Sequence, residues 1–219
     1  SLEQLEFYGQ LSFIKGGLVF SDRITTVSPT YAQEIQTPQF GNGLDGLLRH
    51  RQHALTGILN GIDSRVWNPE EDPELAFHYG RDHLKNKAQC QANLQQELGL
   101  EVKGGPLLGF IGRLVEQKGV DWLLAIMPDL LDQGCQFVIL GSGEERYQEP
   151  LKQLARQWPG QMSLTLGYNE GLSHRITAGC DLFLMPSKFE PCGLNQMYSL
   201  RYGTIPDRKS TRLNSSHYS

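Results

Sequence analysis

Between residues 106 and 185, short apolar runs alternate with longer amphipathic segments. They predict four strands: 107–111, which is a continuous apolar run, 136–140, 162–166, where Met162, Leu164 and Leu166 alternate with polar residues, and 182–185. The segment after the first run places Val120, Leu123 and Met127 on one face, as a helix that covers a sheet does. This strand–helix alternation predicts an α/β fold with a parallel, Rossmann-like sheet and right-handed crossovers. Ligands of such sheets bind at the carboxyl ends of the strands.

The amino-terminal part carries two further strand signals. A β-rich run at 23–27 stops at Ser28-Pro29, and the proline favours a helix over 29–35. A second apolar run, 55–59, ends at Asn60-Gly61, which is a strong turn signal. We interpret residues 1–62 as part of a first domain.

Residues 63–105 are more polar than the segments on either side. Within them, 82–98 is rich in Lys, Gln, Glu and Ala, and it predicts a solvated helix that ends at Gly99. We therefore interpret 63–105 as a connector between the part at 1–62 and a second domain at 106–206.

The final segment, 207–219, does not fit this pattern. Its sequence, DRKSTRLNSSHYS, interrupts a strand that Thr204-Ile205-Pro206 begins. Its polar composition predicts a disordered tail, and the run also resembles translated cloning or adapter sequence. We interpret it as a non-native tail, and a natural polar tail is the alternative.

Composition narrows the function classes. A hydrophobic content of 39% and a charged content of 20% are ordinary for a soluble globular protein. The net charge of −4 offers no basic surface for nucleic acid or anionic lipid, and no apolar run has the length of a membrane span. The start of the chain does not have the pattern of a signal peptide. The four cysteines lack C-x-x-C spacing, so we expect neither a metal site nor a disulfide framework.

A loop that follows the first strand of the second domain contains two cations. The sequence GRLVEQKG, residues 112–119, places Arg113 and Lys118 beside the start of a helix, where a diphosphate would be held. The alternative is a pair of solvated basic side chains in a surface loop.

A second unusual segment, SKFEPCGLNQ at 187–196, follows the fourth strand of this domain. It places Glu190 at a strand end, just before a predicted helix over 194–202 whose first amides could receive a phosphate. The alternative is that Glu190 only caps that helix.

These segments, together with LGSGE, LSHRITAGCD, TTVSPTYAQEI and LNGID, resemble the bacterial glycogen synthase and plant starch synthase family from about residue 3 to Pro206. The resemblance implies a two-domain GT-B fold with an active site in the cleft, of which 1–62 would be the end of the amino-terminal domain. It implies transfer of glucose from ADP-glucose, or UDP-glucose in some members, to the non-reducing end of an α-1,4-glucan. The reaction would retain the anomeric configuration and need no metal or other cofactor.

Carried over by position, the resemblance assigns roles to several residues. Arg113 and Lys118 would bind the diphosphate and stabilise its leaving charge. Glu190 would stabilise positive charge on the glucose ring, and the backbone of Leu194 and Asn195 would meet the diphosphate.

Two positions keep a structural alternative. Tyr168, which follows the third strand, matches a position near the nucleotide base, although a tyrosine there can equally belong to the core or the rim. Asn60 would face the donor glucose, or it is a plain turn residue.

The sequence also departs from related patterns. Many related transferases have a second glutamate eight residues after the first, where this chain has Tyr198, as fits the glycogen and starch synthase branch. A glycine-rich lysine loop, most of the amino-terminal domain and a TGG loop after Pro206 are absent, so we expect a fragment that is inactive alone. The alternatives are another retaining nucleotide-sugar transferase and a non-catalytic nucleotide-binding module. The family implies a bacterial cytoplasmic location or, alternatively, a plastid, and it leaves the oligomeric state open.

Overall fold

The computed structural model describes residues 2–102, 105–188 and 190–208. It divides into two compact units. The smaller unit contains the chain up to Gly61 together with Pro191–Gly193, and the larger unit contains Ile62–Glu190 and the chain from Leu194 onward. The two units are described separately.

The smaller unit is built around a pair of parallel strands. Its elements, in chain order, are η1 (Leu2–Gln4), β1 (Glu6–Phe7), β2 (Gln10–Leu11), α1 (Phe13–Phe20), β3 (Ile24–Val27), α2 (Pro29–Glu34), α3 (Asp45–His50), η2 (Gln52–Ala54) and β4 (Leu55–Ile58). Strand β3 pairs with β4 in parallel, with Ile24 opposite Leu55 and Val27 opposite Ile58. The predicted strands at 23–27 and 55–59 and the helix at 29–35 are therefore confirmed within one residue at each end.

The described residues of the larger unit form a five-stranded parallel sheet in the order β7-β6-β5-β8-β9. Its strands are β5 (Leu107–Ile111), β6 (Gln136–Gly141), β7 (Met162–Leu166), β8 (Leu182–Met185) and β9 (Ile205–Arg208). Its helices are α4 (Lys85–Glu97), η3 (Glu116–Lys118), α5 (Val120–Asp132), α6 (Glu145–Gln157), α7 (Glu170–Gly179) and α8 (Leu194–Arg201). The predicted Rossmann-like sheet and its first four strands are confirmed.

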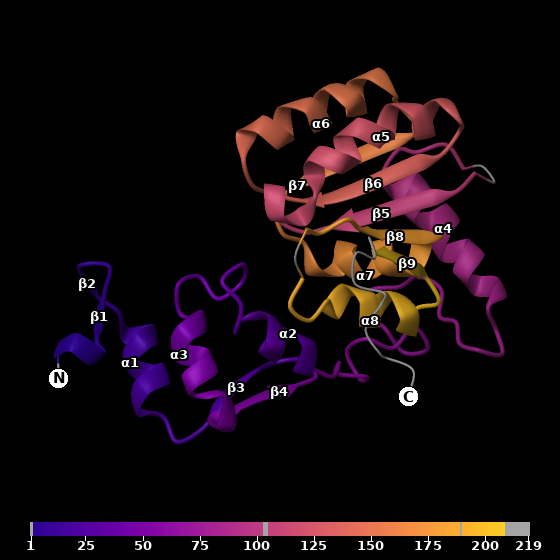
Figure 1. Cartoon of the computed structure of the whole chain (residues 1–219). Coiled ribbons are helices and arrows are strands. Elements are labelled where there is room, and N and C mark those ends of the chain that lie inside the picture. Colours follow the sequence, from indigo (N-terminus) through magenta and orange to yellow (C-terminus); the bar gives the residue numbers. More distant parts are fainter. Residues whose placement is uncertain (1, 103–104, 189, 209–219) are drawn as a thin grey trace. The chain divides into compact units, whose positions relative to one another are not determined.

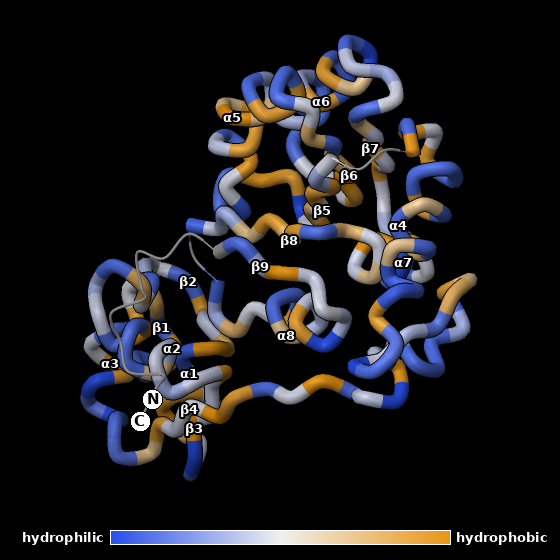
Figure 2. The backbone as a smooth tube through the Cα atoms, turned by 90° about the vertical axis from the view of Figure 1, so that its right-hand side faces the viewer, coloured by the Kyte–Doolittle hydropathy of each residue, from blue (hydrophilic) through white to orange (hydrophobic). Residues whose placement is uncertain are grey.

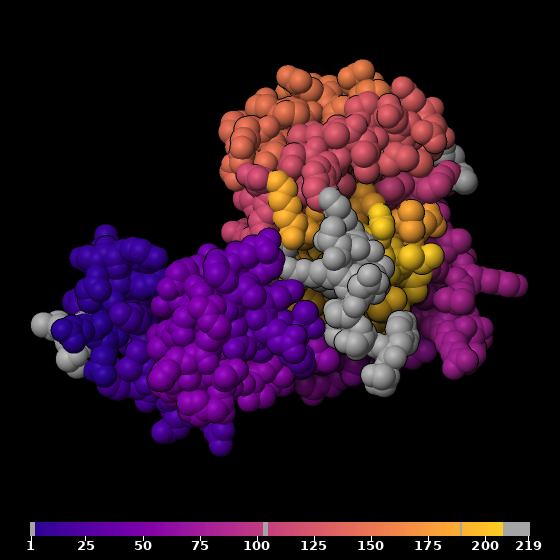
Figure 3. Space-filling model, viewed as in Figure 1, coloured from indigo at the N-terminus to yellow at the C-terminus, as the bar shows by residue number. Residues whose placement is uncertain are grey.

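Helices cover both faces of this sheet (Figure 1). Helices α5 and α6 pack on one face, against alternate strand residues such as Leu108, Phe110 and Phe137. Helices α4 and α7 pack on the other face, against Leu107 and Val138. Because successive side chains of a strand point to opposite faces, a strand covered on both faces is nearly continuously apolar. The tube of Figure 2 shows β5, β6 and β8 as a hydrophobic interior, and Figure 3 shows α5 and α6 at the outer surface of this unit.

Strand β9 corrects one prediction. It pairs with β8 in parallel, with Leu182 opposite Ile205 and Met185 opposite Arg208. The expectation that the strand is interrupted at Asp207 was therefore wrong for residues 207 and 208. The backbone makes the ladder hydrogen bonds whatever the side chain, and an edge strand tolerates polar residues. The rest of the predicted tail, 209–219, lies outside the described residues.

Helix α4 corrects another. It begins at Lys85 rather than near residue 82, and its residues Cys90, Leu94 and Gln95 are buried, with Leu94 packed in the core beside α7. The prediction of a solvated helix was wrong on this side, because a few apolar positions bury one face even when the composition is polar. Among the described residues, no helix is long and apolar enough to cross a bilayer.

Candidate functional site

The loop between β5 and α5 is held in a specific backbone conformation. Gly119 ends η3 with φ of 72°, in the left-handed region. A Cβ at this position would lie 2.1 Å from the carbonyl oxygen of Pro186, so only glycine fits. The close approach brings the loop that carries Arg113 and Lys118 against the loop that follows β8.

The central contact between these two loops is an ion pair. Lys118 Nζ lies 2.6 Å from Glu190 Oε2, and the Ser187 hydroxyl donates to the same oxygen at 3.1 Å. The side chains of Lys118 and Glu190 are 23% and 16% exposed, so the pair is largely shielded but can still be reached from solvent. The structure thus brings together two of the predicted catalytic residues, which lie 72 positions apart in the sequence.

Further bonds tie the same loops together. The backbone amide of Lys188 donates to Gln117 O at 2.9 Å, and Lys188 Nζ lies 2.6 Å from Glu116 and 3.4 Å from Asp121. The hydrogen bond from Lys188 lowers the pKa of Glu116, and the reciprocal bond raises the pKa of Lys188. Because Lys188 and Glu116 are exposed to water, we assign these pairs a geometric role rather than a large stabilising one. Phe189, between Lys188 and Glu190, lies outside the described residues.

Arg113 and Asn195 lie at the end of β5. The exposed guanidinium of Arg113 donates to Gln117 Oε1 at 3.4 Å, within the same loop. Asn195 Nδ2, in the first turn of α8, donates to the carbonyl oxygen of Ile111 at 3.2 Å. Since β5 and β8 are neighbours in the sheet, the candidate residues of both loops and of α8 gather at the carboxyl ends of two adjacent strands. Leu194, which begins α8, is 37% exposed.

The two remaining predicted residues lie elsewhere. Tyr168 follows β7 and is 83% exposed, so it is not a core residue. Strand β6 separates β7 from β5, which places Tyr168 toward one edge of the carboxyl end of the sheet. Asn60 belongs to the smaller unit, where it follows β4 and is exposed.

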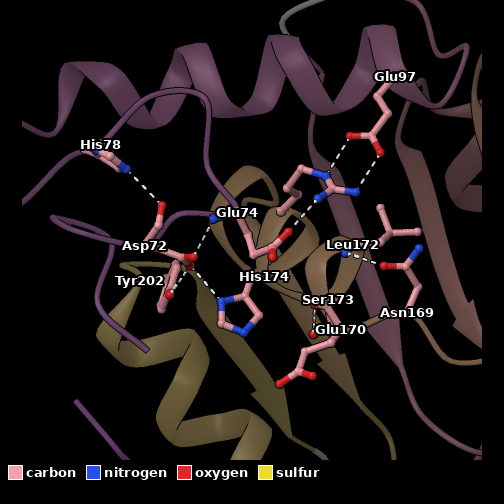
Figure 4. Close-up of polar contacts among 11 residues, drawn as sticks. Asp72, Glu74, His78, Glu97, Asn169, Glu170, Leu172, Ser173, His174 and Tyr202 are labelled. Carbon is pink, nitrogen blue, oxygen red and sulfur yellow. Dashed lines mark hydrogen bonds and ion pairs between the residues drawn. The ribbon is translucent and has the colours of Figure 1, made fainter. Parts of the chain in front are cut away.

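Sequence reasoning missed a buried polar cluster in the larger unit (Figure 4). Asp72 Oδ2 accepts from His174 Nδ1 at 2.7 Å and from the Tyr202 hydroxyl at 2.5 Å, and all three residues are buried. Burial raises the pKa of Asp72, but the bonds from His174 and Tyr202 and from the Glu74 amide outweigh it and hold this pKa below its usual value. Burial and the nearby Asp72 carboxylate raise the pKa of Tyr202. The LSHRI segment contains His174, but nothing in the sequence pairs it with Asp72.

A partly buried lysine was also missed. Lys87 Nζ, on α4, donates to the carbonyl oxygens of Ala178 and Cys180 at 2.6 and 3.0 Å and to Thr204 Oγ1 at 2.7 Å. Burial lowers the pKa of Lys87 to about 8. Two of these acceptors close the end of α7, so Lys87 acts as a C-terminal cap for that helix. Within the described part of the chain, no group of three or more His, Cys, Asp and Glu side chains converges as around a metal ion.

Two family patterns match this chain. Residues 1–50 match the family described as the starch synthase catalytic domain, and residues 105–205 match the glycosyl transferases of group 1. The second match contains Arg113, Lys118, Glu190 and the start of α8.

Curated relatives are glycogen synthases. The chain is 76% identical over 204 residues to the glycogen synthase of Marinobacter nauticus, covering 93% of this chain and 42% of the relative. It is 62% identical to that of Cellvibrio japonicus, again over 93% of this chain and 43% of the relative. The chain thus spans less than half the length of the curated relatives it matches.

Solved structures of related enzymes have the same fold as this chain. The catalytic domain of starch synthase IV from Arabidopsis thaliana, bound to ADP and acarbose, has a TM-score of 0.88 and 40% identity, covering 94% of this chain and 43% of that one. WaaG, a glycosyltransferase involved in lipopolysaccharide biosynthesis, has a TM-score of 0.60 at 15% identity over 95% of this chain and 50% of its own, which shows the fold alone. The chain therefore belongs to the family of bacterial glycogen synthases and plant starch synthases, with the α/β architecture of GT-B glycosyltransferases.

Proposed function

We propose that this chain supplies the donor-binding part of a retaining glucosyltransferase, which adds glucose from ADP-glucose to the non-reducing end of an α-1,4-glucan. The observation that carries the proposal is the Lys118–Glu190 pair at the carboxyl ends of β5 and β8, with Arg113 in the same loop as Lys118. A cation and a carboxylate at this edge match the two charges that develop when a sugar leaves a diphosphate.

The proposed roles follow from those charges. Arg113 and Lys118 would bind the diphosphate and stabilise the negative charge that grows on it as the glycosidic bond breaks. Glu190 would face the glucose ring and stabilise its developing positive charge, as carboxylates do in glycoside hydrolysis. No metal or other cofactor is part of this proposal, because Arg113 and Lys118 would balance the charge of the diphosphate.

The remaining contacts to the donor would come from backbone and rim. The first amides of α8, at Leu194 and Asn195, would donate to the diphosphate at the positive end of the helix. Tyr168 would lie near the base, and Asn60 would face the donor glucose. The ADP in the Arabidopsis starch synthase structure supports an adenine nucleotide, and UDP-glucose is the alternative donor.

The bacterial relatives support a cytoplasmic location, with a plastid as the alternative. The acceptor is proposed to be an α-1,4-glucan because the curated relatives are glycogen synthases.

We further propose that the chain alone does not elongate glucan. The parallel sheet of its smaller unit has two strands, β3 and β4. A parallel sheet is normally stable only when helices cover both of its faces. Large apolar side chains of α1 are open to water, with Phe13 89% and Ile14 69% exposed. Exposed apolar surface of this kind favours association with other molecules over a stable, independently folded domain.

The test compares two proteins. One is the purified chain, and the other is a chimaera in which the 204 matching residues of this chain replace their counterparts in the Marinobacter synthase. Both are assayed for incorporation of labelled glucose into glycogen from ADP-glucose and from UDP-glucose. The expected result is elongation from ADP-glucose by the chimaera only. An inactive chimaera that still binds ADP would instead indicate a nucleotide-binding module, and elongation by the chain alone would overturn the second proposal.

A further inference from the structure

A short segment holds the carboxyl-terminal end of α8. In residues 67–72, which we call the clamp segment, the Trp67 ring stacks on Tyr198 with centroids 3.8 Å apart and planes 8° apart. The next residue, Asn68, is buried, and its Oδ1 accepts from Arg201 Nη2 at 2.8 Å. Both contacts reach the last turns of α8, one through ring stacking and the other through a charge-assisted hydrogen bond.

The third contact of the clamp segment is the buried carboxylate of Asp72. Tyr202, which directly follows α8, donates to Asp72 Oδ2, as does His174 of α7. Figure 4 shows the Tyr202 hydroxyl and the His174 ring converging on this carboxylate. One fully buried oxygen therefore joins the end of α8 to α7. Because it accepts two hydrogen bonds, moving either donor would leave a buried polar group unpaired.

The clamp segment is anchored on α7 by other contacts as well. The second face of Trp67 stacks on His174, with centroids 3.8 Å apart and planes 17° apart. Just after the segment, Glu74 accepts from Arg175 Nη1 at 3.3 Å. Helix α7 is itself fixed to the sheet, because Ile176 lies fully buried in the core. Because the clamp segment contacts both α7 and α8, it fixes the position of α8 relative to the sheet.

The opposite end of α8 carries the donor site of the proposed function. There, Asn195 Nδ2 contacts Ile111 O at the end of β5. Helix α8 has 8 residues, so it spans only about 12 Å and moves as one piece. A tilt at the clamped end would therefore displace the first amides, at Leu194 and Asn195.

We propose that Trp67, Asn68 and Asp72 are positioning residues for the nucleotide-sugar donor: they fix α8 so that its first amides meet the diphosphate. This inference rests on the proposed function of α8. A clamp that serves stability alone would make the protein easier to unfold without changing how well the folded form binds nucleotide. A positioning clamp changes nucleotide affinity in the folded protein.

The test uses the chimaera described above, with ADP as the probe in calorimetric titration. If Trp67→Leu leaves α8 in the binding position only a third to a tenth of the time, the Kd for ADP should rise about three- to tenfold. Trp67→Phe keeps an aromatic ring and should bind nearly as the parent does. Ile139→Val, in the core of β6, should lower stability but leave the ADP affinity unchanged. With ADP-glucose, Trp67→Leu should raise the KM for the donor and leave the KM for glycogen unchanged.

The outcomes separate the two proposals. If the parent chimaera does not bind ADP, the proposed function fails and the positioning role fails with it. If the parent binds ADP and the folded Trp67→Leu protein binds equally well, only the positioning role is overturned. Should Trp67→Leu not fold, Asn68→Ala removes the acceptor of Arg201, and of the Glu70 amide within the clamp segment, while keeping the Trp67 ring. Its Kd for ADP should also rise, and an unchanged value in that folded variant would overturn the positioning role.

Discussion

Lys118 Nζ and Glu190 Oε2 lie 2.6 Å apart at the carboxyl ends of β5 and β8. In the proposed reaction these groups stabilise opposite charges: Lys118 stabilises the negative charge on the diphosphate, and Glu190 stabilises the positive charge on the glucose ring. Their pairing keeps each charge compensated in this partly shielded site before a donor is present. Donor binding would then exchange the carboxylate partner of Lys118 for phosphate oxygens.

We expect Arg113→Ala and Lys118→Ala to lower the kcat of the chimaera by roughly 10²–10³-fold, with little change in the KM for glycogen. The lost charge acts on the leaving diphosphate, not on the acceptor. Initial rates of labelled-glucose incorporation measure both constants. Lys152→Ala, on the surface of α6, is the matched control and should leave kcat unchanged. If kcat is unchanged in either site variant, that residue has no part in the mechanism.

Glu190→Gln tests the carboxylate with its shape preserved. The variant should fold normally and still accept the Ser187 hydrogen bond, yet lose transfer activity by roughly 10²-fold or more, because an amide cannot balance the charge on the sugar. Circular dichroism checks the fold and the incorporation assay checks the rate. An active Gln variant would show that Glu190 serves only the local structure.

The sequence predicted the larger unit well because its signals are local. The strand at 107–111 is a continuous apolar run and the strand at 136–140 is apolar after Gln136, and each buries both faces. Strand β9 was missed beyond Pro206 because pairing with β8 does not depend on the polar side chain of Asp207. The burial of α4 was missed because Cys90 and Leu94 are a small share of a polar helix.

The site was predicted only where a motif contains it. Lys118 and Glu190 each lie in a recognisable segment, so their meeting follows from the strand order. Asp72 and His174 lie 102 positions apart, and neither is flanked by a pattern that indicates a buried pair. Such contacts depend on how α7, α8 and the clamp segment pack, which hydrophobic periodicity does not specify.

Two glycines allow the loop geometry to be tested by a matched pair. Gly119 and Gly134 have φ of 72° and 89°, so an alanine at either position suffers backbone strain of about 1–2 kcal/mol. At Gly119 the added Cβ also collides with Pro186 O, whereas at Gly134 nothing lies within 4 Å. Gly119→Ala should therefore lower the free energy of unfolding by about 1–3 kcal/mol more than Gly134→Ala does. Urea denaturation of both variants measures the difference, and equal losses would contradict the close approach of the two loops.

The Asp72 cluster should be costly to break. Asp72→Ala leaves His174 Nδ1 and the Tyr202 hydroxyl buried without their acceptor, so the free energy of unfolding should fall by about 3–5 kcal/mol. Asp72→Asn keeps one side-chain oxygen, so its free energy of unfolding should fall by less than that of Asp72→Ala. Because the folded protein lowers the pKa of Asp72, its ionised form stabilises the fold above pH ~4, and this contribution is lost as the pH falls through the folded-state value. Urea denaturation at pH 7 and at acidic pH measures both effects, and a wild-type-like Asp72→Ala protein would show that the cluster is dispensable.

Because of Lys87, the free energy of unfolding of the protein should increase as the pH rises above neutral. Burial lowers its pKa to about 8, against the attraction of Cys180 and Asp181, whereas in an unfolded chain a lysine titrates near pH ~10.4. Between these values the unfolded state binds more protons than the folded state, so the free energy of unfolding increases with pH. The burial penalty is present in full below pH 8 and is relieved as the pH approaches the unfolded-state value.

Lys87→Met removes the titrating group, so subtracting its unfolding free energy from that of the wild type isolates this contribution. From pH 7 to pH 10 the difference should rise, in favour of the wild type, by on the order of 2 kcal/mol. Lys85→Met, which removes an exposed lysine from the same helix, is the control and should give a difference that stays flat. Other titrating groups are common to all three proteins and cancel in the subtraction. Parallel pH profiles for the wild type and Lys87→Met would mean that Lys87 keeps its proton in the folded protein, held by the carbonyl oxygens of Ala178 and Cys180.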